Sequence, residues 1–198
     1  MIFTGKPHDK ETHMKSLILW QRSLMLLASL WLAACASPYD TAWYANETPA
    51  LSLPHYFNGT LDAWGMFQDR SGKIVKRFSV VMQCEWQGDT GVLHEDFTYA
   101  DGSKQTRIWT LKKIADHQIS GTAADVVGEA KGVVSGNTLH WNYVLALPVD
   151  GKVINVDFDD TMVLMDNKVM LNRAIMSKFG VDLGSVSLSF SKRDGQEK

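Results

Sequence analysis

Residues 77–86 read RFSVVMQCEW, and this stretch decides the fold class. Phe78, Val80, Met82, Cys84 and Trp86 fall on one side of the period-two pattern. The residues between them are mostly polar. Because successive side chains of a strand point to opposite faces, this alternation predicts a strand with one buried face.

The same pattern continues from this strand in both directions. Gly88 to Gly91 predicts a turn, residues 92–99 a second strand, and Ala100-Asp101-Gly102 a hairpin turn. Further strands are predicted over 106–114, in shorter runs around 118–127 and 129–135, and over 138–147, 153–165, 168–176 and 186–190. Residues 174–184 are ambiguous, because they also fit one helical turn.

Nine or ten strands joined by short turns favour an antiparallel up-and-down barrel, which removes exposed sheet edges. A β-sandwich is the alternative. No helical stretch of convincing length interrupts the strands.

The region before the strands has the layout of a secretory signal. Lys15 and Arg22 lie before or at the start of an apolar run over 23–32, and Leu-Ala-Ala-Cys ends at Cys35. The run is too short for a transmembrane helix, which needs about 20 apolar residues. The four residues resemble a bacterial lipobox, which implies that residues 1–34 are removed and that Cys35 is lipidated. Met14 is the more natural start, because residues 1–13 are polar.

The lipobox assignment implies a place in the cell. Ala36 and Ser37 follow the cysteine without an aspartate at the second position, which by resemblance to sorted bacterial lipoproteins implies the periplasmic face of the outer membrane. Residues 35–56 contain three of the five prolines and are predicted to be a lipidated tether. Residues 57–198 are predicted to form the barrel. Leu51, Leu53, Tyr56 and Phe57 suggest that the tether ends by docking on the barrel.

Composition excludes several function classes. The chain has 20 Lys and Arg against 22 Asp and Glu and no basic run, so nucleic acid is not an expected partner. The common hydrolase, metalloprotease and phosphate-binding motifs are absent, and we expect no metal, no cofactor and no catalytic set. Cys84 shares an apolar strand face and is predicted to be a buried small side chain.

Charged residues on apolar strand faces are the candidate ligand-binding residues. A three-residue turn over 100–102, with Gly102 left-handed, sets Glu95 opposite Arg107 beside Trp109. A two-residue turn would set Asp96 there instead and would break the apolar grouping. Such a Glu–Arg pair either locks the register or meets the carboxylate or phosphate of a ligand.

A second pair is predicted in the last third of the chain. A two-residue turn at Asp166-Asn167 sets Asp160 opposite Arg173, whereas a three-residue turn sets Thr161 there. We expect the first arrangement. Asp125 is a further acid in an apolar setting, without an assignable partner.

Four segments resemble the bacterial lipoprotein family filed as domain of unknown function 3833. They are Tyr56-Phe57-Asn58-Gly59 with 63–65 and 69–72, then 124–128, then 159–162, and finally 172–173 with 178–180. The resemblance implies a lipocalin-like barrel and an envelope location, and it brings no established activity.

These observations together favour a binding protein. We expect an outer-membrane lipoprotein whose barrel holds a fatty acid, a phospholipid or another hydrophobic ligand. A scaffold that docks another envelope protein is the second hypothesis. An enzyme acting on lipid through inward acids, with Asp159 among the candidates, is the third.

Overall fold

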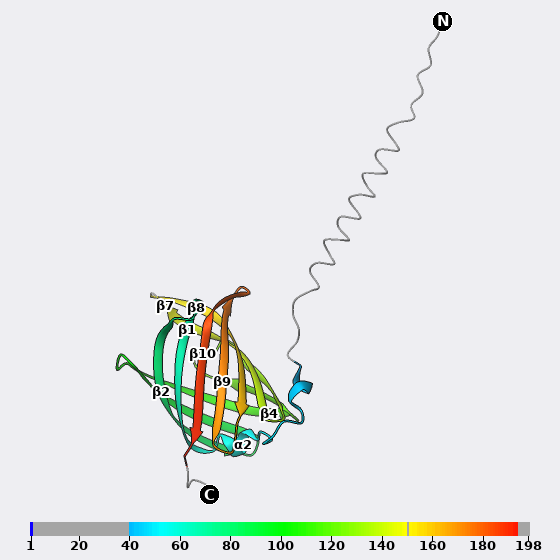
Figure 1. Cartoon of the computed structure of the whole chain (residues 1–198), viewed down its shortest axis with the longest axis vertical. Coiled ribbons are helices and arrows are strands. Elements are labelled where there is room, and N and C mark those ends of the chain that lie inside the picture. The colour runs from blue at the N-terminus through cyan, green and yellow to red at the C-terminus, as the bar shows by residue number, and fades with distance from the viewer. Residues whose placement is uncertain (2–39, 150, 194–198) are drawn as a thin grey trace. The chain divides into compact units, whose positions relative to one another are not determined.

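The computed structural model describes Met1, residues 40–149 and residues 151–193, and it shows a closed antiparallel barrel (Figure 1). Each strand pairs with its neighbours in sequence, and β1 closes the ring by pairing with β10. The strands in the described part are β1 (Gly59–Asp69), β2 (Ile74–Gln87), β3 (Thr90–Tyr99), β4 (Lys104–Ala115), β5 (Gln118–Thr122), β6 (Ala130–Ser135), β7 (Thr138–Val149), β8 (Lys152–Leu164), β9 (Val169–Lys178) and β10 (Val181–Lys192).

The predicted fold class is confirmed. In β2, Val80, Met82 and Cys84 are buried while Val81 and Gln83 are exposed, as the period-two pattern requires. The β1–β10 ladder runs over nine paired positions, from Leu61 opposite Lys192 to Asp69 opposite Gly184. This continuous closure rules out the sandwich alternative.

The predicted β3–β4 register is also confirmed. Glu95 lies opposite Arg107, and the Tyr99 N–H donates to the Ser103 carbonyl at 2.9 Å. Gly102 has a φ of +83°, the left-handed conformation that this turn needs and that glycine adopts without cost.

The predicted β8–β9 register is wrong. Thr161, not Asp160, lies opposite Arg173, because the loop has three residues rather than two. The Asp166 carboxylate accepts from the N–H groups of Lys168 and Val169 at 2.7 Å each, which holds the wider loop closed. A two-residue hairpin turn usually needs positive φ at both positions, and this loop has no glycine to supply it.

The ambiguous segment 174–184 contains no helical turn. It is the β9–β10 hairpin, with Val181 opposite Lys178. Phe179 and Gly180 form the turn with φ values of +53° and +76°.

One end of the barrel is closed by the chain that enters it. The segment includes the short helices η2 (Thr41–Tyr44) and α2 (Leu53–Tyr56). Leu51, Leu53, Tyr56 and Phe57 are buried, so the expected docking is confirmed. The Tyr56 hydroxyl donates to the Lys168 carbonyl at 3.0 Å across the end of the barrel.

The buried clusters of the described residues lie within the barrel unit. Thr41–Lys198 form one compact unit, and both clusters lie between Leu51 and Phe190. A chain beginning at residue 36 therefore contains every described residue of the two clusters.

Several expectations concern residues that the structure does not describe. Apart from Met1, the signal peptide over 1–34 lies outside the described residues, as do the start at Met14 and the lipidation of Cys35. Among the residues that are described, no helix has the length and apolar character of a membrane span.

Candidate functional site

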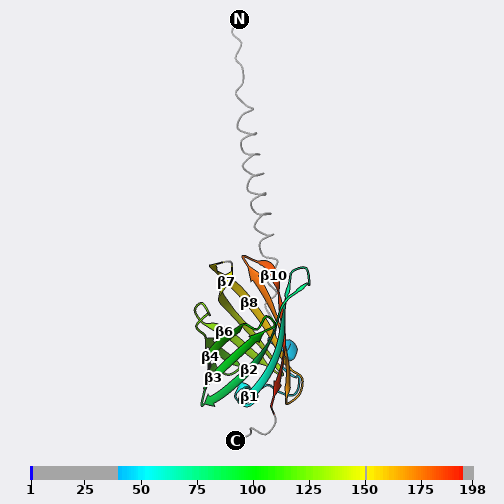
Figure 2. The same cartoon turned by 90° about the vertical axis from the view of Figure 1, so that its left-hand side faces the viewer.

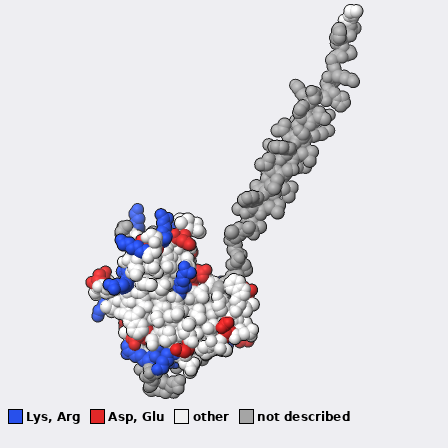
Figure 3. Space-filling view, viewed as in Figure 1, with Lys and Arg blue, Asp and Glu red and all other residues white. Residues whose placement is uncertain are grey.

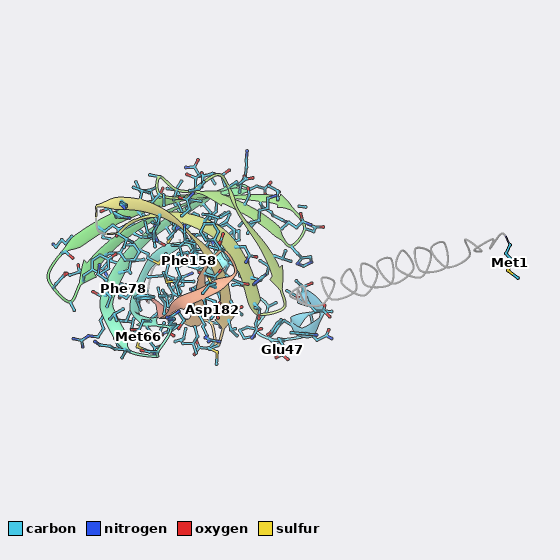
Figure 4. All side chains as sticks on the ribbon, turned by 90° about the horizontal axis from the view of Figure 1, so that it is seen from above. Met1, Glu47, Met66, Phe78, Phe158 and Asp182 are labelled. Carbon is cyan, nitrogen blue, oxygen red and sulfur yellow. The ribbon has the colours of Figure 1, made fainter. Side chains whose placement is uncertain are left out.

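The barrel encloses a cavity of about 670 Å³. The lining residues Leu53, Phe57 and Phe190 at the α2 end are each at most 6% exposed. The lining residues Lys76, Gln105 and Val149 at the other end are exposed, so the cavity opens there. Because the strands alternate in direction, this end carries the β1–β2, β3–β4, β5–β6, β7–β8 and β9–β10 turns, and Figure 4 shows the ring of strands from above.

A charged cluster stands on one wall of the cavity. Arg107 Nε donates to both carboxylate oxygens of Asp125, at 3.1 and 3.0 Å, and its Nη2 donates to Oδ2 at 2.8 Å. Glu95 lies further away, with its Oε2 3.9 Å from Arg107 Nη1. The guanidinium is thus committed to Asp125, which lies in the β5–β6 loop, and Glu95 keeps only a long ionic contact with it.

A second polar group, formed by β7, β8 and β9, also lines the cavity. Asp160 Oδ2 accepts from the Asn172 amide at 3.2 Å and from the Tyr143 hydroxyl at 3.4 Å. Asp160 and Asn172 are 3% and 6% exposed. Within the described residues, Oδ1 of each of these two side chains is buried without a hydrogen-bond partner. Buried acceptors without a hydrogen-bond partner are costly and rare.

The electrostatics of the two groups are linked. Burial raises the pKa of Glu95 to about 7, partly offset by the charge of Arg107. Burial likewise raises the pKa of Asp160 to about 7, against the hydrogen bonds from Asn172 and Tyr143. The charge of Asp160 adds to the rise at Glu95. Near neutral pH, each acid is therefore divided between its charged and uncharged forms.

Aromatic side chains make up much of the remaining wall. Trp109 lies edge-on to Trp141 and Tyr143, with ring centroids 5.7 and 5.5 Å apart. Tyr143 stacks on Phe158 at 5.0 Å. Nearer the mouth, Phe78, Phe97 and Tyr99 form a second aromatic group. The cavity is thus mainly apolar, with the polar groups set into its wall.

The structure brings five of the six candidate ligand-binding residues to this cavity: Glu95, Arg107, Trp109, Asp125 and Asp160. Arg173 is the exception, because it is exposed on the outer face of β9. Asp159 is also an outer residue, with its carboxylate 2.5 Å from His140 Nε2, so it is not an inward acid.

Sequence reasoning missed Tyr143, Asn172 and Trp141. The period-two pattern of β7 contains the signal for two of them, because Trp141, Tyr143 and Leu145 share one face. The Asp125–Arg107 contact continues the β4–β5 pairing of Thr110 with Thr122, but a register shift near the turn obscures it in the sequence.

Metal and thiol chemistry receive no support from the geometry. Across residues 40–149 and 151–193, no three His, Cys, Asp or Glu side chains gather as a metal site. Cys84 is 2% exposed, as predicted, and burial raises the pKa of its thiol to about 12. A thiol in that state is a poor nucleophile.

Comparison with solved structures identifies similar barrels. The S-type phycobiliprotein lyase CPES from Guillardia theta has a TM-score of 0.53 and 8% identity, covering 81% of this chain and all of the lyase chain. A de novo designed fluorescence-activating β-barrel has a TM-score of 0.41 and 10% identity, covering 72% of this chain and 99% of the design. The likeness to the lyase shows a shared lipocalin-like fold.

Comparison with protein families gives the assignment. No curated protein matches the chain. The family model described as "Protein of unknown function (DUF3833)" matches residues 29–192, which is most of the sequence. The chain belongs to this family.

Proposed function

We propose that this chain is a cell-envelope lipoprotein whose barrel binds one elongated apolar molecule. The observation that carries the proposal is the cavity of about 670 Å³, open at one end and walled mainly by aromatic and aliphatic side chains. Pockets for small molecules commonly have about 300–1,000 Å³ and this composition. A barrel whose interior was filled by side chains would instead have favoured the hypothesis of a scaffold for another envelope protein. In this proposal Cys35 carries the acyl anchor in the outer membrane, and the tether leads to the closed end.

The polar groups in the wall limit what the ligand carries. Arg107 is the cation of the cluster, and Asp125 already accepts three hydrogen bonds from it. Glu95 and Asp160 remain as two further acids. A carboxylate or phosphate entering the cavity would therefore meet more negative than positive charge. We infer that the polar group of the ligand donates hydrogen bonds.

This inference orders the candidate ligands. A long-chain alcohol or amine fits, because a hydroxyl or ammonium group donates to Glu95. A fatty acid fits in its protonated form, which also donates. A phospholipid fits less well, because its phosphate keeps its negative charge at every pH of interest.

An uncharged fluorescent apolar probe, N-phenyl-1-naphthylamine, tests the proposal with residues 36–198. We expect the probe to brighten on binding and to be displaced by dodecanol. Dodecanoic acid should displace it better at pH 6 than at pH 8. Ala174→Phe places a large ring in the cavity from a buried lining position and should weaken binding several-fold.

The matched control is Trp64→Ser, because Trp64 is 55% exposed on the outer wall and does not line the cavity. Equal probe binding by Ala174→Phe and Trp64→Ser would contradict binding inside the barrel. Better displacement by the acid at pH 8 would contradict the donor preference.

One observation favours a second function, that of a proton-transfer enzyme. Glu95 and Asp160 both have a pKa near 7 beside an apolar cavity, which is the range that general acids and bases use. The two functions are distinguished by whether the bound compound is chemically changed. A bound compound recovered chemically unchanged after hours with the protein supports binding, and a change that Glu95→Gln abolishes supports catalysis.

A further inference from the structure

Exposed apolar side chains gather at three of the five turns around the mouth of the cavity, the β1–β2, β7–β8 and β9–β10 turns. We call residues 69–76, 149, 151–153 and 178–182 the rim. Figure 2 shows the labelled β7, β8 and β10 at the upper end of the barrel, and the β1–β2 turn lies at the same end. The exposed apolar residues of the rim are Phe179 at 91%, Val153 at 70%, Val181 at 55%, Ile74 at 50%, Val75 at 48% and Val149 at 43%.

Phe179 is the least expected of these residues. It occupies the tip of the β9–β10 turn with a φ of +53°, where glycine or asparagine would be less strained. Its ring contacts Lys178, whose Nζ lies 4.8 Å from the ring centroid. Phe179 nevertheless stays 91% exposed, so its apolar surface is open to a partner.

Basic side chains lie among these exposed apolar residues. Arg70, Lys73, Lys76, Lys152 and Lys178 belong to the rim. Figure 3 shows Lys and Arg at the upper end, with Asp or Glu beside them, as well as at the lower end. The acids of the same turns are Asp69, Asp182 and, from the sequence alone, Asp150. Asp69 is already occupied, because its Oδ1 accepts from Ser71 N at 2.8 Å and Lys73 N at 3.1 Å. The rim therefore carries five basic residues against three acids, with Asp150 counted from the sequence. The β3–β4 and β5–β6 turns at the same end add Lys104, Asp101 and Glu129 besides the paired Asp125, so the excess of positive charge belongs to the rim.

We propose that the rim docks the mouth of the barrel on an anionic lipid bilayer. Phe179 lies in a turn, and the other five apolar residues lie at the strand ends beside the three turns. They are thus divided among separate hairpins around an opening, whereas a folded protein partner would cover one continuous patch. Apolar residues at hairpin ends of this kind insert to headgroup depth while flanking Lys and Arg attract lipid phosphates. The entering segment lies at the opposite end, where the Leu51 N–H donates to the Gly136 carbonyl at 2.8 Å, so it leaves the rim free.

This docking would place the open end of an apolar cavity against the hydrocarbon phase. A ligand could then pass between bilayer and barrel without crossing water. The docking itself goes beyond the proposed ligand binding and does not require it, because an empty barrel has the same rim.

Sedimentation with vesicles tests the inference, using residues 36–198 so that neither the apolar run nor an acyl chain contributes. We expect binding to phosphatidylglycerol vesicles, much weaker binding to phosphatidylcholine vesicles, and loss of affinity as salt rises. Lys73→Glu with Lys152→Glu should lower the affinity for the anionic vesicles by about tenfold or more.

Phe179→Asn is the decisive variant. Asparagine tolerates left-handed φ, so this change removes the apolar tip without straining the turn. We expect about a fivefold to twentyfold loss of affinity for the anionic vesicles. Trp64→Ser, which removes an exposed aromatic from the outer wall, should leave affinity unchanged.

Three results would overturn the inference: no binding to anionic vesicles, equal affinity of Phe179→Asn and the parent chain, or an equal loss in Trp64→Ser. Probe uptake measured without vesicles separates this inference from the proposed function. A chain that takes up the probe but ignores vesicles refutes only the docking, and the reverse result refutes only the cavity ligand.

Discussion

Replacing Asp160 by asparagine should stabilise the barrel, and increasingly so as the pH rises. In the folded chain burial raises the pKa of this carboxyl from 3.8 to about 7. The folded state therefore holds the proton more tightly than the unfolded state. Between pH 4 and pH 7 the unfolded chain releases that proton first, so the free energy of unfolding falls as the pH rises through this window. Above pH 7 both states are ionised and the loss stays constant.

The magnitude follows from the difference between the two pKa values. One pH unit corresponds to about 1.4 kcal/mol, so a difference of about three units gives at most about 4 kcal/mol. Asparagine cannot ionise, so the variant does not lose this free energy of unfolding as the pH rises. Its carboxamide has the shape of the protonated acid, and its Nδ2 offers a donor to the unpartnered Asn172 Oδ1. We expect little difference from the parent near pH 4 and up to about 4 kcal/mol of added stability at pH 8.

Urea unfolding of residues 36–198 at pH 4, 5, 6, 7 and 8 measures this difference. The control is Asp157→Asn, which changes an exposed carboxylate on the outer face of the same strand and should follow the parent curve at every pH. A constant stability difference for Asp160→Asn across the range, or a destabilised variant at pH 8, would refute the assignment of Asp160 as a buried acid that is protonated below neutral pH.

Three further predictions concern other parts of the chain. Arg107→Met leaves Asp125 and Glu95 without their cation and should lower the free energy of unfolding by about 2–4 kcal/mol at pH 8 and by less at pH 6. A double-mutant cycle with Asp125→Asn at pH 8 checks the pair, and additive costs would mean that the two side chains do not interact. Gly136→Ala should lower the free energy of unfolding in urea by about 1–3 kcal/mol, because the φ of Gly136 is +53° and a Cβ there would overlap the Tyr44 carbonyl. Gly88→Ala is the control, because Gly88 has a φ of +58° but open space around it, and it should cost less. Equal costs would exclude the overlap. Cys35→Ser should prevent incorporation of radioactive fatty acid in bacterial cells, and label in the variant would disprove the lipobox.

The fold was predictable because its information is local. The period-two pattern of residues 78–86 specifies which face of β2 is buried, and short turns between such strands favour a closed barrel. The β3–β4 register was also predictable, because Gly102 marks the left-handed position of a three-residue turn. That register placed Glu95 and Arg107 correctly.

The β8–β9 register was mispredicted because the loop has no glycine to mark its geometry. A side-chain contact, from Asp166 to two backbone N–H groups, decides its length. The period-two pattern of β9 could have corrected this prediction. Met170, Asn172, Ala174 and Met176 are all buried, which leaves Arg173 on the outer face.

The partner of Asp125 follows from the β4–β5 hairpin. Thr110 pairs with Thr122, and the same register continued for three residues sets Asp125 beside Arg107. The irregular pairing near the β4–β5 turn hides this register in the sequence. The pKa of Glu95 depends on tertiary structure, because burial raises it and the charges of Asp125 and Asp160 add to the rise.

Recovery of a bound molecule tests the central claim most directly. Residues 36–198 are expressed behind a cleavable secretion signal and purified without detergent. The protein is then extracted with organic solvent, and the extract is analysed by mass spectrometry. The account predicts close to one apolar molecule per barrel, bearing a hydroxyl, amine or carboxyl group, and much less from Ala174→Phe than from Trp64→Ser. An empty extract from a chain that also fails to take up the fluorescent probe would contradict ligand binding.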